Sequence, residues 1–217
     1  MKKNLLTISL ALFSFAVSAQ DIKLPEPDVN QQSMTVVEAL KTRHSVRNFD
    51  ATKDLSNHEL SNLCWAACGI VRDGNHRTSP TARNLQEIRL FAFTKSAVYE
   101  YDAKSNTLVM KVEGDHRDLM VSNGGNGGFR QDFVKDAPVT LLMVVDYDIY
   151  GSQGEGALMM GCVDAGNVSE NINLYCQSVG LATVPRATHD KEGIRKLLGF
   201  SEKQLPIMNN PVGYEKQ

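Results

Sequence analysis

The sequence has little cysteine, a single tryptophan and no excess of basic residues. Four cysteines between positions 64 and 176 are too few and too far apart for the disulfide scaffold of a small secreted domain. The 23 basic and 25 acidic residues give a formal net charge of −2, so no positive surplus is available to neutralise the phosphates of a nucleic acid. What is present, 42% apolar and 22% charged residues over 217 positions, is typical of one globular domain or a tight pair.

A hydrophobic run of the ~20 residues that a spanning helix needs is also missing. Instead, Lys2 and Lys3 precede a mostly apolar stretch over residues 5–17, which ends in the small residues of a signal-peptidase site at 17–19. This pattern predicts a secretory signal over residues 1–19 and export to a bacterial periplasm or beyond, without stable insertion into the membrane. An uncleaved anchor is the alternative.

The cysteines bear on the redox state after export. An oxidising compartment favours disulfides. Cys64 and Cys68, however, lie one turn apart on a predicted helix, where buried cysteine is common. We therefore expect packed thiols at these positions, with a disulfide as the alternative.

The start of the predicted domain is marked by a change in composition. Residues 20–33 are polar and contain two prolines, which predicts an N-terminal arm without core contacts ahead of one domain over residues 34–217. Thr35 stands three residues before Glu38, the capping-box spacing that opens a helix. The apolar side of this helix consists of Val36, Val37 and Leu40.

Further helices and strands alternate irregularly along the rest of the chain. Three helices are expected, opened by Ser56, near Asp164 and by the N-cap Asp190, and followed by Gly69, Gly180 and Gly199. Strands are expected at residues 88–93, 98–101, 108–112, 138–145, 181–185 and 205–212, and loops at 70–86, 123–128 and 151–156. Because strict βαβ alternation is absent, the expected fold class is α+β.

The segment after the first helix, RHSVR at residues 43–47, can hold a phosphate. Arginine makes bidentate, charge-assisted hydrogen bonds and serine adds a donor, which makes Arg43, Ser45 and Arg47 candidate ligands. Cations near the C-terminus of a helix also stabilise its dipole, and this is the alternative role.

A second candidate segment, SPTARNLQ at residues 79–86, lies ahead of a strand. Its small residues would let a planar ligand approach the backbone, and the amide of Asn84 can bond a ring that offers donors and acceptors. The alternative is a simple turn.

Taken together, five segments resemble the nitroreductase-like flavin oxidoreductases, over about Thr35 to Tyr214. They are residues 43–47, residues 79–86, Asp164–Gly166 with Asn171 and Leu174, residues 180–185 and residues 210–214. Each motif is short, but all five occur in the family's order. The hairpin over residues 98–112 is most similar to the branch that includes azoline (thiazole and oxazole) dehydrogenases.

The resemblance implies a nitroreductase-like fold, with a mostly antiparallel central sheet flanked by helices, and an intertwined homodimer with two sites at the subunit interface. It implies non-covalently bound FMN, through which hydride passes at N5 from a reduced nicotinamide or another donor to a small-molecule acceptor, such as a nitroaromatic or a quinone. A non-catalytic flavin- or ligand-binding protein and a dehydrogenase of a peptide-derived substrate are the alternatives.

The resemblance also assigns cofactor contacts, while the catalytic side chain stays unassigned. Within the string Arg43, His44, Ser45 and Arg47, the two arginines and the serine would hold the phosphate, the ribityl chain and the pyrimidine edge. Pro80, Thr81, Ala82 and Asn84 would reach the same flavin from the other subunit. Pro185, Arg186, Ala187 and Thr188 would run past the ring near N5, and Lys216 is the one C-terminal cation available for the phosphate.

The sequence departs from the family's pattern near N5. Family members often carry Glu-Gly or Gly-Gly where this chain has Ala187 and Thr188, so a side-chain carboxylate is missing there, although backbone contacts can survive. Arg186 and His189 are either compensating cations over the site or surface residues.

A second departure concerns the substrate. The azoline dehydrogenases resemble one another in a Lys-Tyr pair before the central helix, and this chain has Ile149 and Tyr150. Isoleucine cannot replace a lysine base, so oxidation of peptide heterocycles is not expected. The histidines lack metal-ligand spacing, and no metal site is expected either.

Overall fold

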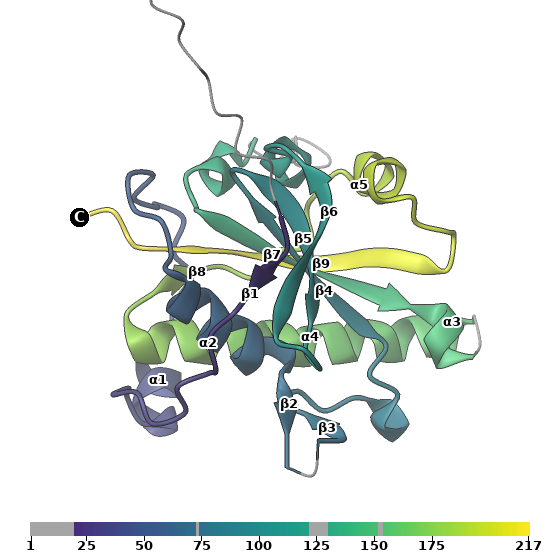
Figure 1. Cartoon of the computed structure of the whole chain (residues 1–217), viewed down its shortest axis with the longest axis horizontal. Helices are drawn as coiled ribbons and strands as arrows, with labels where there is room; N and C mark the ends of the chain where they lie inside the picture. Colours follow the sequence, from purple (N-terminus) through teal and green to yellow (C-terminus); the bar gives the residue numbers. More distant parts are fainter. Residues whose placement is uncertain (1–19, 73, 122–129, 152–153) are drawn as a thin grey trace, which may run out of the picture.

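The structure is a computed structural model that describes residues 20–72, 74–121, 130–151 and 154–217. The predicted secretory signal and the glycine-rich residues 123–128 lie outside these ranges. Within them, seven strands form one sheet in the order β1-β6-β5-β4-β7-β9-β8, and every neighbouring pair is antiparallel (Figure 1). In that order the strands are Ile22–Lys23, Thr107–Glu113, Ala97–Asp102, Ile88–Thr94, Val139–Asp146, Gln204–Gly213 and Ala182–Thr183. The expected α+β class, with a mostly antiparallel sheet flanked by helices, is confirmed.

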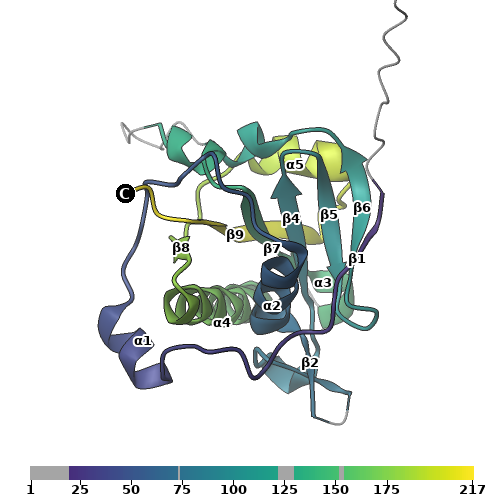
Figure 2. The ribbon, with the colours of Figure 1, turned by 60° about the vertical axis from the view of Figure 1, so that its left-hand side comes forward.

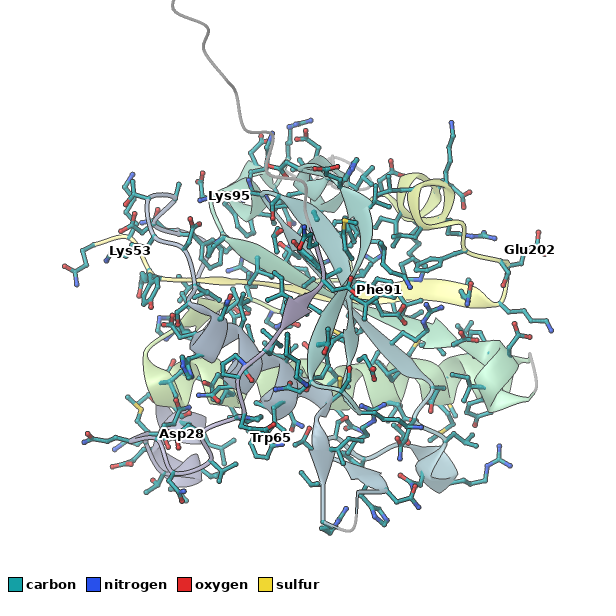
Figure 3. All side chains as sticks on the ribbon, in the orientation of Figure 1. Asp28, Lys53, Trp65, Phe91, Lys95 and Glu202 are labelled. Atoms are coloured by element: carbon teal, nitrogen blue, oxygen red, sulfur yellow. The ribbon has the colours of Figure 1, made fainter. Side chains whose placement is uncertain are left out.

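Successive side chains of a strand point to opposite faces of the sheet, and a hydrophobic core packs on each face. Leu90 and Ala92 of β4 pack with helices α2 (Asn57–Cys68) and α4 (Glu155–Val179). Phe91 and Phe93 point the other way, toward α5 (Lys191–Leu198) and the short turns η2 (Arg117–Met120) and η4 (Asp132–Lys135). Figure 2 shows α4 and α5 on opposite sides of the sheet, and Figure 3 labels Phe91 near the crossing of β4 and β9.

Both predicted capping boxes are present. Thr35 caps α1 (Val36–Thr42) together with Glu38, and Ser56 caps α2 together with Glu59. The apolar side of α1, however, does not pack within the protomer, because Val36, Val37 and Leu40 are 67%, 74% and 56% exposed. Helical periodicity predicts an apolar face but not what covers it.

Helix α4 is longer than the sequence pattern predicts. It begins at Glu155 rather than Asp164, so Glu155 and Gly156, expected in a loop, are helical. The added turns include Ala157, Leu158 and Met159, which are good helix formers. The helix follows α3 (Tyr147–Tyr150) closely and ends at Gly180, whose φ of 78° is left-handed.

The expected long loop over residues 70–86 contains structure. Strands β2 (Ile70–Val71) and β3 (His76–Arg77) pair as a small hairpin, followed by the helical turn η1 (Ala82–Asn84). Half-buried Trp65, labelled in Figure 3, donates from its indole N–H to the carbonyl oxygen of Ile70 (3.2 Å), which ties the hairpin to α2.

The four cysteines are free thiols. Cys64, Cys68 and Cys176 are buried, and Cys162 is exposed on α4. Burial raises the pKa of the Cys68 thiol to about 11, so it packs as a neutral side chain. The expected packed thiols at Cys64 and Cys68 are confirmed.

The N-terminal arm joins the domain, contrary to the expectation that it lacks core contacts. Ile22 and Lys23 form β1 and pair with β6 at the edge of the sheet. Leu24 is 2% exposed and belongs to the core under α2. A two-residue strand leaves no periodicity in the sequence, so its pairing with residues 107–108 could not be predicted locally.

We expect Leu24→Ala to lower the free energy of unfolding by about 2–4 kcal/mol, because it leaves a cavity in a packed core. Urea denaturation measures the effect. Val29→Ala is the matched control, since Val29 lies on the same arm and is largely exposed, and it should change stability by less than about 0.5 kcal/mol. Equal effects of the two variants would show that the arm is not docked through Leu24.

Candidate active site

The segment of residues 43–47 is anchored by its backbone and displays its polar side chains. Buried Val46 donates its N–H to the carbonyl oxygen of Thr183 in β8 (3.0 Å) and packs with Ala182. The four other residues of the segment, Arg43, His44, Ser45 and Arg47, are exposed. The result is a fixed stretch of chain with two exposed arginines and an exposed hydroxyl beside β8.

The C-terminus lies against the same segment. The N–H of Lys216 donates to the carbonyl oxygen of Asn48 (3.0 Å), and Phe49 forms a β-bridge with Glu215. The fold therefore brings Lys216 next to the arginine segment, from opposite ends of the chain. This neighbourhood is where the sequence places the phosphate contacts.

Residues 185–189 form the third part of this neighbourhood. Arg186 exchanges two backbone hydrogen bonds with Asn209 of β9 (2.8 and 2.7 Å), Ala187 is exposed, and Pro185 and Thr188 are half-buried. Neither expectation for His189 holds. It is buried rather than a surface residue, and burial lowers its pKa to about 4, so it is neutral rather than a cation at neutral pH.

The second candidate segment forms a strained turn. Arg83, Asn84 and Gln86 all have positive φ, near 55°, which costs non-glycine residues on the order of 1–2 kcal/mol each. The amide of Asn84 donates to the carbonyl oxygen of Asn75 (3.0 Å) and accepts from the side chain of Gln86 (3.1 Å), so this amide holds the turn itself. Thr81 and Ala82 are half-buried, and Pro80 is exposed.

The two candidate segments lie apart within one protomer. The N–H of Ala82 donates to the carboxylate of Asp164 (2.9 Å), in the first half of α4. Val46 is bonded to β8, which follows the end of α4 at Val179. The helix between Asp164 and Val179 measures about 20 Å at its usual rise per residue. The two segments are therefore attached near opposite ends of this stretch of α4.

Comparison with known proteins agrees with this architecture. The sequence model of the nitroreductase family matches residues 40–214, which is most of the chain. This chain belongs to the nitroreductase family. Members of the family are oxidoreductases that generally bind FMN, and they are often dimers.

Relatives carry the same family name. A nitroreductase-named protein of Methanocaldococcus jannaschii is 25% identical over 199 residues, covering 86% of this chain and 93% of its own length. A crystal structure of a nitroreductase-named protein of Ralstonia eutropha is 28% identical, with a TM-score of 0.81 over 99% of this chain and 97% of that one. The Escherichia coli microcin synthetase complex McbBCD shares the fold, with a TM-score of 0.66 at 16% identity over 88% of this chain and 77% of that chain.

The structure also brings two buried carboxyl groups together, those of Glu87 and Asp164, and no pattern in the sequence predicts this pairing. Glu87, just before β4, is 0% exposed, and neither of its carboxyl oxygens has a hydrogen-bond partner among the described residues. Burial first, and then the neighbouring buried Asp164, raise its pKa to about 7. Asp164 is the residue that holds Ala82, so this pair lies directly under the second candidate segment. A lone glutamate at the start of a strand has no pattern that distinguishes it from a surface residue.

The residues around the anchored segment 43–47 suit an anionic cofactor such as FMN. Arg43, Arg47 and Lys216 are exposed cations beside a serine hydroxyl, the donor set that binds a phosphate. Buried Arg186 has no acidic partner among the described residues, so an anion there would offset its charge. The described ranges contain no group of three or more metal-ligating side chains and no helix long and apolar enough to cross a membrane.

Proposed function

We propose that this chain is an FMN-dependent oxidoreductase that carries hydride from NAD(P)H, or another reduced donor, to an electron-poor small molecule such as a nitroaromatic or a quinone. The observation that carries the proposal is the anchored segment of residues 43–47, which presents two arginines and a serine beside Lys216 and residues 185–188. The family match supports the same cofactor.

In this site the chain's own residues bind and orient. Arg43, Ser45 and Lys216 neutralise and hold the phosphate, and Arg47 reaches the ring. Ala187 and Thr188 carry no carboxylate, so this stretch offers backbone N–H groups and a hydroxyl rather than a side-chain base. When bound, FMN supplies the hydride chemistry.

The site is completed by a second copy in this proposal. The separation of the two candidate segments along α4 supports this, as do the exposed apolar side chains on α1 and α4. Pro80, Thr81, Ala82 and Asn84 would then belong to the partner's half of the site.

The proposal includes export, for which the support is the residue pattern of positions 1–19. We expect protein recovered from the periplasm to begin at Gln20. An N-terminus at Met1 in the membrane fraction would instead support an uncleaved anchor.

The absorbance spectrum of the purified protein, supplied with FMN, tests the cofactor directly. We expect a bound-flavin spectrum that bleaches with anaerobic NADPH or NADH and recovers with a nitroaromatic compound. We expect Arg47→Ala to weaken FMN binding at least tenfold, because it removes a charge-assisted hydrogen bond worth about 1.5–3 kcal/mol.

Lys41→Ala is the matched control, since Lys41 is an exposed cation in the last turn of α1, outside the segment. It should leave FMN affinity nearly unchanged. Full FMN affinity in Arg47→Ala would overturn the assignment of Arg47. Bound flavin that no donor reduces would favour the non-catalytic binding protein, an outcome consistent with the absent carboxylate at residues 187–188.

A further inference from the structure

Arg186 is a buried cation whose charge is not neutralised. Its side chain is nearly inaccessible, at 6% exposed for the residue. The guanidinium donates only to neutral oxygens: Gln131 Oε1 (2.6 Å), Asn209 Oδ1 (2.8 Å), the carbonyl of Met120 (3.0 Å) and Thr188 Oγ1 (3.1 Å). No carboxylate of the described residues forms an ion pair with it, and residues 122–129, which follow Met120 closely, contain no acid.

A second buried arginine shows the ordinary solution. Arg117 is also 6% exposed, but its guanidinium makes two hydrogen bonds to the carboxylate of Asp115 (2.9 and 2.6 Å). A buried charge normally has such a partner, because moving an unpaired charge out of water into the protein costs free energy. The guanidinium of Arg186 therefore has hydrogen-bond partners, but no carboxylate of the described residues neutralises its charge.

Phe133 connects Arg186 to the anchored segment, because its ring lies under the guanidinium and also packs against the cluster that contains Val46. Burial, followed by repulsion from Arg47, lowers the pKa of Arg186 to about 10, so it remains protonated at neutral pH. Arg47 is exposed on the anchored segment, whereas Arg186 is fixed between β9, η2 and η4, with Phe133 5.6 Å from its guanidinium carbon. The fixed cation Arg186 and the exposed cation Arg47 are thus linked through Phe133 and Val46.

We propose that Arg186 is a positioning residue that supplies a fixed positive field at the flavin site, and that this field selectively stabilises the reduced, anionic ring. The inference rests on the proposed function. Two electrons and one proton convert the neutral oxidised ring into a ring with one negative charge. A charge buried in a low dielectric acts over a longer range than one in water, so Arg186 can act without touching the ring. In the proposed site, Arg47 is the arginine that would contact the ring.

The midpoint potential of bound FMN measures this effect. In Arg186→Gln, we expect the affinity for reduced FMN relative to oxidised FMN to fall about tenfold, which lowers the potential by ~30 mV for a two-electron couple. Arg186→Lys should stay close to the wild type, because it keeps the charge. Arg117→Gln is the matched control: it removes a buried arginine outside the site and should leave the potential unchanged.

A second pair of variants tests the charge without removing Arg186. The Thr188 hydroxyl already accepts a hydrogen bond from this guanidinium, so Thr188→Asp should place a carboxylate against it. We expect Thr188→Asp to lower the potential as Arg186→Gln does, and Thr188→Asn to lower it far less. This pair decides the question if Arg186→Gln fails to fold.

The two proposals fail in different ways. Wild-type protein that binds no FMN would overturn the proposed function. Wild-type protein that binds FMN, with an unchanged potential in folded Arg186→Gln or in Thr188→Asp, would overturn the role of Arg186 alone.

Discussion

Replacing Glu87 by glutamine is expected to make the protein progressively more stable than the wild type as the pH rises from about 4.5 to 7. Glu87 is wholly buried beside the carboxyl group of Asp164. Its pKa is raised to about 7, against about 4.3 for glutamate in an unfolded chain. At this one carboxyl group, the folded protein therefore binds more protons than the unfolded chain in this interval.

The sign of the effect follows from proton linkage. A group whose pKa is raised by folding contributes stability below its unfolded pKa, and this contribution is lost as the pH rises through its folded pKa. The wild type should lose on the order of 2–3 kcal/mol between pH 4.5 and pH 8 through this group. Glutamine is neutral throughout, so Glu87→Gln should be more stable than the wild type at pH 8 and similar at pH 5.

Urea denaturation at pH 5, 6, 7 and 8 measures the difference between the two proteins. Glu26→Gln, on the exposed surface of the arm, is the matched control and should track the wild type at every pH. A constant difference between Glu87→Gln and the wild type across this range would contradict a protonated Glu87 in the folded state. His189 acts in the opposite direction, because its pKa is lowered to about 4, and it costs stability as the pH falls below about 6.5 in both proteins.

The carboxyl pair connects stability to the candidate site. Asp164 accepts the hydrogen bond from Ala82, and an ionised Glu87 repels the same carboxylate. The buried hydroxyl of Tyr147 also has no partner among the described residues, and its pKa is raised to about 12 by burial first and then by Cys162 and Glu87. Ionisation of Glu87 therefore acts on the strained turn that the sequence resemblance assigns to the cofactor.

Local patterns in the sequence predict much of the secondary structure but few of its long-range contacts. The capping boxes at Thr35 and Ser56, the N-cap Asp190 and the buried strand β7 follow from spacing and composition within one segment. The docking of Leu24 under α2 joins residues far apart in sequence, and no local periodicity encodes it.

In the candidate site, too, local sequence predicts the chemistry of a segment but not its position in the fold. The segment of residues 43–47 carries recognisable chemistry, whereas its position beside Lys216 depends on the pairing of β8 with β9. Arg186 lies in a segment that the resemblance assigns to the cofactor, and Glu87 stands in no recognisable pattern, but the sequence does not show that either residue is buried. Their burial follows only from the packing of the finished sheet, and for this reason their roles emerge from the structure.

The exposed apolar side chains on two helices lead to the prediction with the largest effect, on assembly. Val36, Val37 and Leu40 on α1 are mainly exposed, as are Leu158, Met159 and Val163 on α4. Apolar groups grouped on helix faces are typical of protein interfaces. The attachment of the two cofactor segments near opposite ends of one stretch of α4 also favours a site shared with a second copy. We therefore expect a homodimer in solution.

Replacing Val37 and Leu40 together by glutamate should raise the dimer dissociation constant at least 100-fold. The two carboxylates would either lose their hydration in the interface or keep the two protomers apart, at a cost of about 3 kcal/mol or more. Sedimentation velocity measures assembly. Val29→Glu, equally exposed but on the arm, should leave the dimer intact. FMN affinity should fall together with dimerisation in the double variant, although Arg43, Ser45 and Arg47 are unchanged. A wild-type monomer that binds FMN tightly would contradict the shared site, because one protomer would then suffice.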